Sequence, residues 1–125
     1  MDLNVRPALQ LMQALLPGMR SARFGRIINV TSLVTRGFAF RASYAAAKAA
    51  LESLTRTMAL ELAAHDITAN AIAPGPTETE LFRANNPPGS EGEARYLRNV
   101  PMRRFAQPEE IAAAQISSSI RGRGP

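Results

Sequence analysis

Two short stretches rich in β-branched residues stand on either side of a long alanine-rich segment, and this order limits the folds open to the chain. Residues 27–31 and 67–73 have the composition of buried strands, the first with both faces covered, whereas residues 43–64 favour a helix. Strand, helix and strand of these lengths form a right-handed βαβ unit, in which the strands are parallel. The sequence therefore predicts an α/β fold in which both strands end at the same edge of a sheet.

Polar and reactive side chains fall at this edge. Ser32 follows the first strand, and Tyr44 and Lys48 lie one turn apart near the start of the helix. Ligands of open α/β sheets bind beyond the carboxyl ends of the strands. A neighbouring ammonium and a place in the first turn of a helix both favour the ionised form of a phenol, so Tyr44 is a candidate general acid and base. The hydroxyl of Ser32 is suited to hold the oxygen of a carbonyl substrate for it.

Simpler interpretations exist for each of these residues. A tyrosine and a lysine spaced by four also occur on many solvated helix faces, and a serine after a strand is often part of a turn. Thr31 competes with Ser32 for the substrate-facing position. Lys48 is, however, the only lysine in a chain whose other permanent cations are all arginine, and arginine cannot give up its proton as lysine can. This favours a chemical role for the ammonium.

Three motifs in register resemble a known family. They are the run at residues 25–32, the pattern Tyr44-x-x-x-Lys48 and the run at residues 70–79. Over residues 2–114 the chain resembles the C-terminal half of a short-chain dehydrogenase/reductase, and in particular members similar to 3-oxoacyl-(acyl carrier protein) reductases. The resemblance implies a partial Rossmann-like, doubly wound α/β fold, with parallel strands flanked by helices, that lacks the N-terminal dinucleotide-binding half. It also implies an NAD- or NADP-dependent oxidoreductase that interconverts small carbonyl compounds and alcohols.

The same resemblance assigns roles to individual residues. It implies a catalytic group of Asn4, Ser32, Tyr44 and Lys48, and it implies cofactor contacts by Tyr44, Lys48, Pro74, Gly75, Thr77 and Thr79. In the family the asparagine holds a water in a relay to the lysine, although asparagine near the start of a helix is more commonly a cap. No metal site is expected, because the single histidine, His65, falls at the end of a helix without partners for a metal.

The remaining segments are predicted from breaker residues and periodicity. Residues 3–22 form a helix with a broad apolar face and Pro17 near its end. Residues 33–42 form a loop over the pocket, and the Phe38 and Phe40 of this loop either line an apolar cleft or pack in the interior. Residues 81–98 form a mobile lid with a short helix at either end, and Pro108 starts a further helix with two acids in its first turn. Residues 115–125 diverge from the family and are predicted to be disordered.

Composition narrows the range of partners. The net charge of +5 is spread over the whole chain without interleaved aromatic side chains, so nucleic acid is not expected as a partner. No apolar run approaches the ~20 residues of a membrane span, and the first residues lack the features of a secretory signal. With no cysteine, the chain is compatible with a reducing cytoplasm, which is the predicted location.

A glycine-rich turn for the pyrophosphate of a dinucleotide is missing from the sequence. We therefore expect a fragment of an oxidoreductase, which binds NAD or NADP weakly by itself. The alternative is a noncatalytic remnant that acts as an interaction module through the helices at 3–22 and 43–64, which in the family pair across a dimer axis. A homo-oligomer formed through these helices is expected. A basic nucleic-acid binder is a third reading.

Overall fold

The computed structural model describes residues 2–119, and its centre is a pair of parallel strands. β1 (Gly25–Val30) and β2 (Ile67–Ile72) pair in a register that runs from Gly25 opposite Ile67 to Val30 opposite Ile72. The crossover between them contains the short 3-10 helix η1 (Leu33–Arg36), the long helix α2 (Ala42–Leu62) and η2 (Ala63–His65). The predicted order of strand, helix and parallel strand is confirmed.

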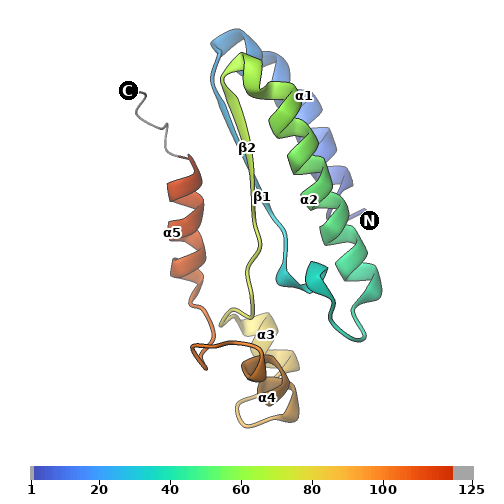
Figure 1. Ribbon diagram of the computed structural model, residues 1–125, viewed down its shortest axis with the longest axis vertical. Coiled ribbons are helices and arrows are strands. Elements are labelled where there is room, and N and C mark those ends of the chain that lie inside the picture. The colour runs from blue at the N-terminus through green and yellow to red at the C-terminus, as the bar shows by residue number, and fades with distance from the viewer. Residues whose placement is uncertain (1, 120–125) are drawn as a thin grey trace.

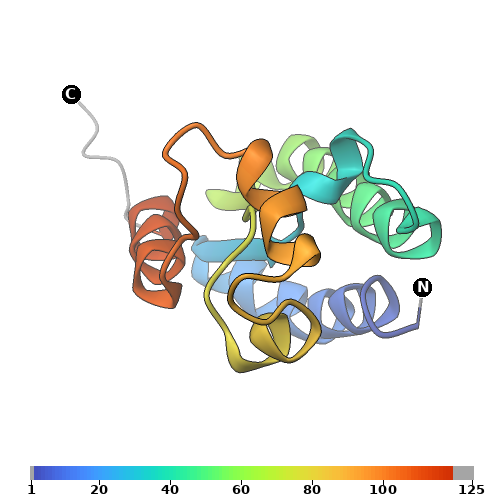
Figure 2. The ribbon, with the colours of Figure 1, turned by 90° about the horizontal axis from the view of Figure 1, so that it is seen from below.

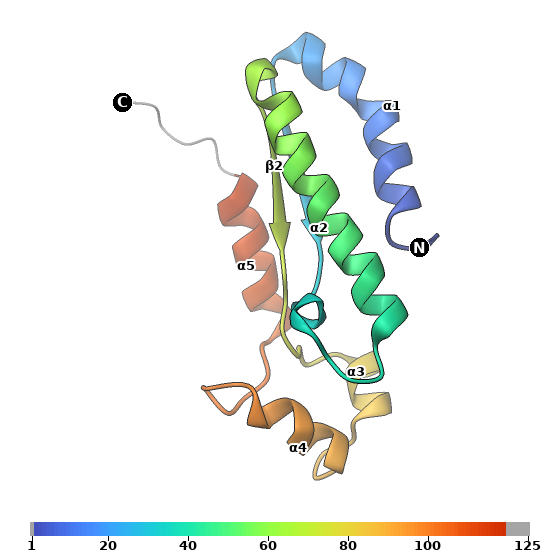
Figure 3. The ribbon, with the colours of Figure 1, turned by 45° about the vertical axis from the view of Figure 1, so that its right-hand side comes forward.

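Helices cover both faces of this pair of strands. α1 (Arg6–Ala22) and α2 lie side by side on one face, and α5 (Pro108–Ser119) lies on the other (Figures 1 and 3). The two short helices α3 (Glu80–Asn85) and α4 (Glu91–Arg98) lie beyond the carboxyl ends of the strands, and a view from that end places them nearest the viewer (Figure 2). The arrangement is a layered α/β fold with an extra helical segment at the edge where a ligand is expected.

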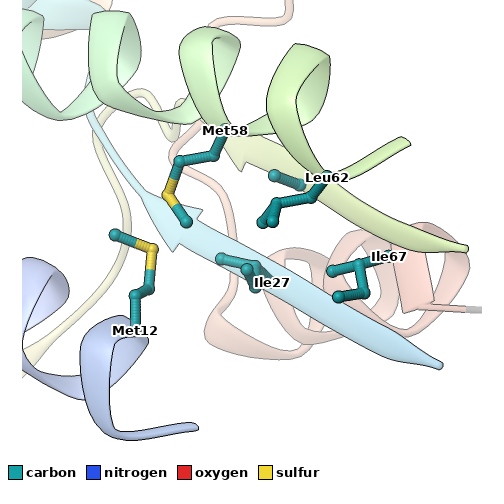
Figure 4. Close-up of a cluster of buried hydrophobic side chains, with 6 residues drawn as sticks. Met12, Ile27, Met58, Leu62 and Ile67 are labelled. Carbon is teal, nitrogen blue, oxygen red and sulfur yellow. The ribbon is translucent and has the colours of Figure 1, made fainter. Parts of the chain in front are cut away.

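The core lies between the strands and the α1–α2 layer. Figure 4 shows its side chains converging from two helices and both strands. They are Met12, Ile27, Met58, Leu62, Ile67 and Ala69. Leu62 and Ile67 are the largest fully buried side chains of the described residues, so burial of apolar area is concentrated where α2 meets β2.

The prediction that the first strand is buried on both faces is only half right. Ile27 is buried, but Ile28 is half-buried and Val30 is 39% exposed. Side chains alternate between the two faces of a strand. Among residues 2–119 two long helices cover the face of Ile27, whereas only α5 covers the opposite face, so the second face stays partly open.

Helix ends follow local chemistry. α1 has Pro7 in its first turn, continues through Pro17 and ends at Ala22, and the next residue, Arg23, adopts a left-handed conformation with φ 46°. α5 begins at Pro108 with two acids in its first turn, as predicted.

Disorder from residue 115 onward is a wrong prediction for residues 115–119, which belong to α5. The hydroxyls of Ser118 and Ser119 donate to the backbone carbonyls of Ala114 and Ile116, so the helix itself provides partners for these polar side chains. Residues 120–125 of the predicted tail lie outside the described residues. Within residues 2–119, no helix combines the length and the apolar character that crossing a membrane requires.

Candidate active site

A cavity of about 670 Å³ opens at the carboxyl ends of β1 and β2, and six of the predicted site residues line it. Its size is typical of a small-molecule site. The six residues are Ser32, Tyr44, Pro74, Gly75, Thr77 and Thr79. They come from three segments that the βαβ unit brings to one edge: the turn after β1, the first turn of α2 and the turn after β2.

Ser32 has an extended backbone and caps η1, where its Oγ accepts a hydrogen bond of 3.3 Å from the Val34 N–H. An accepting hydroxyl keeps its own proton, so Ser32 can still donate to a substrate oxygen in the cavity. Thr31 is buried, and its hydroxyl donates to the carbonyl of Ile72 at 3.1 Å. Thr31 thereby ties the two strands together and does not line this cavity, so the geometry favours Ser32 as the substrate-facing hydroxyl.

Tyr44 and Lys48 lie on one face of α2. The Lys48 Nζ lies 5.7 Å from the centroid of the Tyr44 ring, and Tyr44 is 40% exposed and lines the cavity. Lys48 itself does not line the cavity but donates to the carbonyl of Val30 at 2.7 Å. Partial burial lowers the pKa of Lys48 from its ordinary value, because burial disfavours the charged ammonium. The pair therefore combines an accessible phenol with a held cation.

Asn4 is the remaining residue of the predicted catalytic group. It is half-buried in the turn before α1 and is not among the residues that line the cavity. The helix cap falls on Val5, which makes no side-chain capping bond, so the simpler reading of Asn4 as a cap is not met either. The relay role of Asn4 stays a prediction.

The turn after β2 is fixed against the turn after β1. The Leu33 N–H donates to the Pro74 carbonyl at 3.1 Å, and a Cβ on Gly75 would lie only 3.2 Å from the Leu33 side chain. The Thr77 hydroxyl donates to the Gly75 carbonyl, and the Thr79 hydroxyl accepts from the Phe82 N–H as the cap of α3. This wall presents hydroxyl and backbone groups, which suit a ligand with amide and sugar groups.

The segment that contains α3 and α4 closes the other side of the cavity, and its two short helices confirm the predicted elements of the lid. Its ends are pinned together, because Glu78 N–H donates to Ala106 and the Ala106 N–H donates to Pro76. Inside it, Arg83 forms ion pairs with Glu78 and Glu93. The segment therefore leaves and rejoins the fold at one place and has its own internal contacts.

Aromatic rings join this segment to the loop at residues 33–42. Phe38 stacks on Tyr96 of α4, with ring centroids 4.9 Å apart, and both side chains line the cavity. Phe82 in turn contacts Tyr96 and Phe105. Phe38 thus takes one of its predicted roles. Phe40 takes neither, because it is 94% exposed and does not line the cavity.

Several further residues line the cavity that the sequence analysis did not single out, among them Arg36, Arg41 and Tyr96. Arg41 directly precedes α2, so its closeness to Tyr44 was readable from helical spacing. Tyr96 had no local signal, since only the docking of α4 brings it to the cavity. The described residues contain no group of His, Asp and Glu side chains suited to a metal ion.

The fold and this cavity define a Rossmann-like α/β unit with its site at the carboxyl ends of parallel strands. The family described as enoyl-(acyl carrier protein) reductase matches residues 1–117. The chain therefore belongs to the short-chain dehydrogenase/reductase family.

Individual relatives agree with this assignment. The 3-oxoacyl-[acyl-carrier-protein] reductase FabG of Vibrio harveyi is 43% identical over 114 residues, which cover 90% of this chain and 46% of the relative. A solved short chain dehydrogenase/reductase family protein superposes with a TM-score of 0.85 at 39% identity, over 94% of this chain and 47% of the other. ElxO with NADP bound gives 0.86 at 26% identity, over 96% and 49%. The chain spans about half the length of the proteins it matches.

Proposed function

We propose that this chain carries the reaction centre of an NAD(P)-dependent oxidoreductase that interconverts carbonyl compounds and alcohols. The observation that carries the proposal is the cavity shared by Ser32 and Tyr44, with the Lys48 ammonium beside the Tyr44 ring. The names of the relatives as reductases support it.

Each residue has a chemical task in this proposal. The Ser32 hydroxyl donates a hydrogen bond to the substrate carbonyl oxygen and polarises it. The Tyr44 hydroxyl gives its proton to the same oxygen during reduction and recovers one from the alcohol in the reverse reaction. The Lys48 ammonium favours negative charge on the phenol oxygen as the proton leaves.

The residues around the cavity fit one half of a dinucleotide. The hydroxyls of Tyr44, Thr77 and Thr79, the backbone of Gly75 and the Lys48 ammonium match the amide and sugar groups of its nicotinamide end. The bound cofactor supplies the hydride that the carbonyl carbon accepts. ElxO, which is similar over nearly all of this chain, has NADP bound. We propose that Pro74 and Asn4 belong to the same centre, Pro74 beside the nicotinamide and Asn4 through a bound water.

The test uses a chimaera in which the part of the Vibrio harveyi reductase that precedes the matched region is joined in front of this chain. We expect NAD(P)H-dependent reduction of a 3-oxo compound, offered both as the acyl thioester and as the free 3-oxo acid, and we expect Tyr44→Phe to lower the rate by at least ~10²-fold. Tyr96→Phe is the matched control, because it removes the other phenol of the cavity. Near-full activity of the Tyr44→Phe chimaera would remove Tyr44 from the mechanism.

A second candidate function rests on a different observation. Leu11 and Leu15 on α1 and Leu60 on α2 are 61%, 54% and 84% exposed. Apolar faces of this kind favour burial against another chain. We propose that α1 and α2 form a homo-oligomeric interface. Such an interface would also allow the chain to act as a noncatalytic interaction module.

A further inference from the structure

The charge lining the cavity is all of one sign. Two arginines, Arg36 and Arg41, take part in the lining, and no Asp, Glu, Lys or His does. Arg36 also borders the neighbouring cavity along β2, whereas Arg41 borders this one alone among the cavities described. A ligand in this space therefore meets uncompensated positive charge at one side of an otherwise neutral wall.

Arg41 is placed to use that charge. It occupies the cap position of α2, one helical turn before Tyr44, where the helix dipole adds to its positive field. Within residues 2–119, Arg36 and Arg41 form no ion pair, in contrast to Arg83 and Arg104, which hold glutamates. The Arg41 Nη2 donates a hydrogen bond of 3.5 Å to the phenol oxygen of Tyr96. No carboxylate of the described residues pairs with the guanidinium.

An arginine with free donors at the rim of a cavity matches one kind of ligand group. The planar fork of N–H groups of an arginine binds the two oxygens of a carboxylate or phosphate through two parallel hydrogen bonds. A neutral carbonyl group has a single oxygen and cannot bind in this way. Arg41 and Tyr44 both line this cavity, so one ligand bound in it can contact both side chains.

We infer that the carbonyl substrate of this site carries an anionic group, a carboxylate or a phosphate, a few bonds from the carbonyl, and that Arg41 binds it. The inference rests on the proposed function, since it takes the Tyr44 hydroxyl as the place of the carbonyl oxygen. Arg36 adds to the positive field, and the contact of Arg41 with Tyr96 links the anion position to α4.

The test is a binding titration of the 125-residue chain at low ionic strength, followed by NMR. Two matched pairs of probes are compared: acetoacetate with methyl acetoacetate, and dihydroxyacetone phosphate with dihydroxyacetone. We expect the anionic member of at least one pair to bind about tenfold or more tightly than its neutral partner. Preference within the first pair identifies a carboxylate, and preference within the second identifies a phosphate.

Variants assign the preference to a residue. Arg41→Gln abolishes it, while Arg95→Gln, which removes an equal charge from α4 outside the cavity, keeps it. Equal binding of both members of each pair, or absence of binding by all four probes, overturns the inference. An equal loss in both variants does so too, because it would reflect net charge alone.

The reductase assay and this titration test the proposed reaction and the anion site independently. If the chimaera loses activity on Tyr44→Phe but the 125-residue chain binds charged and neutral probes equally, the anion site is refuted and the proposed reaction stands. If the chain prefers the charged probes but the chimaera keeps its activity on Tyr44→Phe, the proposed reaction is refuted and the anion site stands.

Discussion

The Lys48 ammonium donates a hydrogen bond of 2.7 Å to the backbone carbonyl of Val30, the last residue of β1. This bond holds the side chain at the carboxyl end of the strand, where Ser32 follows two residues later and the Tyr44 ring lies 5.7 Å away. The end of β1 thus gives the Lys48 side chain a defined position in the fold.

The first prediction concerns the protonation of this lysine. Partial burial lowers the pKa of Lys48, so the folded chain binds that proton less tightly than the unfolded chain does. Folding stability should therefore rise with pH from the folded-state pKa up to the unfolded value of 10.5. Because Lys48 is the only lysine, isotopic methylation labels one side chain, whose NMR titration gives its pKa. Titration at or above the value in the urea-unfolded chain would contradict the structure.

The second prediction concerns dinucleotide affinity. Most anchoring of NAD or NADP comes from the pyrophosphate, held by a glycine-rich turn and a helix N-terminus, whereas the proposed function assigns residues of this chain to the nicotinamide end. A few hydrogen bonds worth ~0.5–1.5 kcal/mol each must offset an association cost of at least ~4 kcal/mol. We expect dissociation constants of about 1 mM or weaker in calorimetric titrations with both cofactors. A micromolar value for either would show that the nicotinamide end suffices.

The third prediction concerns self-association. Sedimentation across a wide range of concentrations should show dimers or larger species, because the exposed leucines of α1 and α2 gain burial in them. Leu15→Asp should shift the equilibrium toward the monomer, since a carboxylate resists burial. Met102→Asp is the control, as Met102 is 71% exposed but lies outside both helices. A folded parent chain that stays monomeric throughout would exclude this interface.

The fourth prediction concerns the core. Leu62 is 1% exposed and Leu60, two residues earlier on α2, is 84% exposed. Leu62→Ala should lower the free energy of unfolding by ~2–5 kcal/mol, because it leaves a cavity between α2 and β2, while Leu60→Ala should change it by less than about 0.5 kcal/mol. Urea denaturation at one low protein concentration measures both. Similar losses in the two variants would place the core elsewhere.

The sequence was sufficient for the features that depend on local spacing. The order of strands and helices followed from propensity and periodicity, as in residues 27–31 and 43–64. The meeting of Ser32 and Tyr44 at one cavity followed as well, because parallel strands end at a common edge and α2 begins there.

Contacts between distant segments were decided only by the tertiary structure. The role of Thr31 as a tie between strands, the exposure of Phe40 and the stacking of Phe38 on Tyr96 have no signature in any short window of sequence. The same holds for the positive lining of the cavity, since the charge that Arg41 presents depends on which acids pack nearby. Local propensity acts over a few residues, whereas these contacts arise from the packing of whole elements, which fixes the surroundings of each side chain.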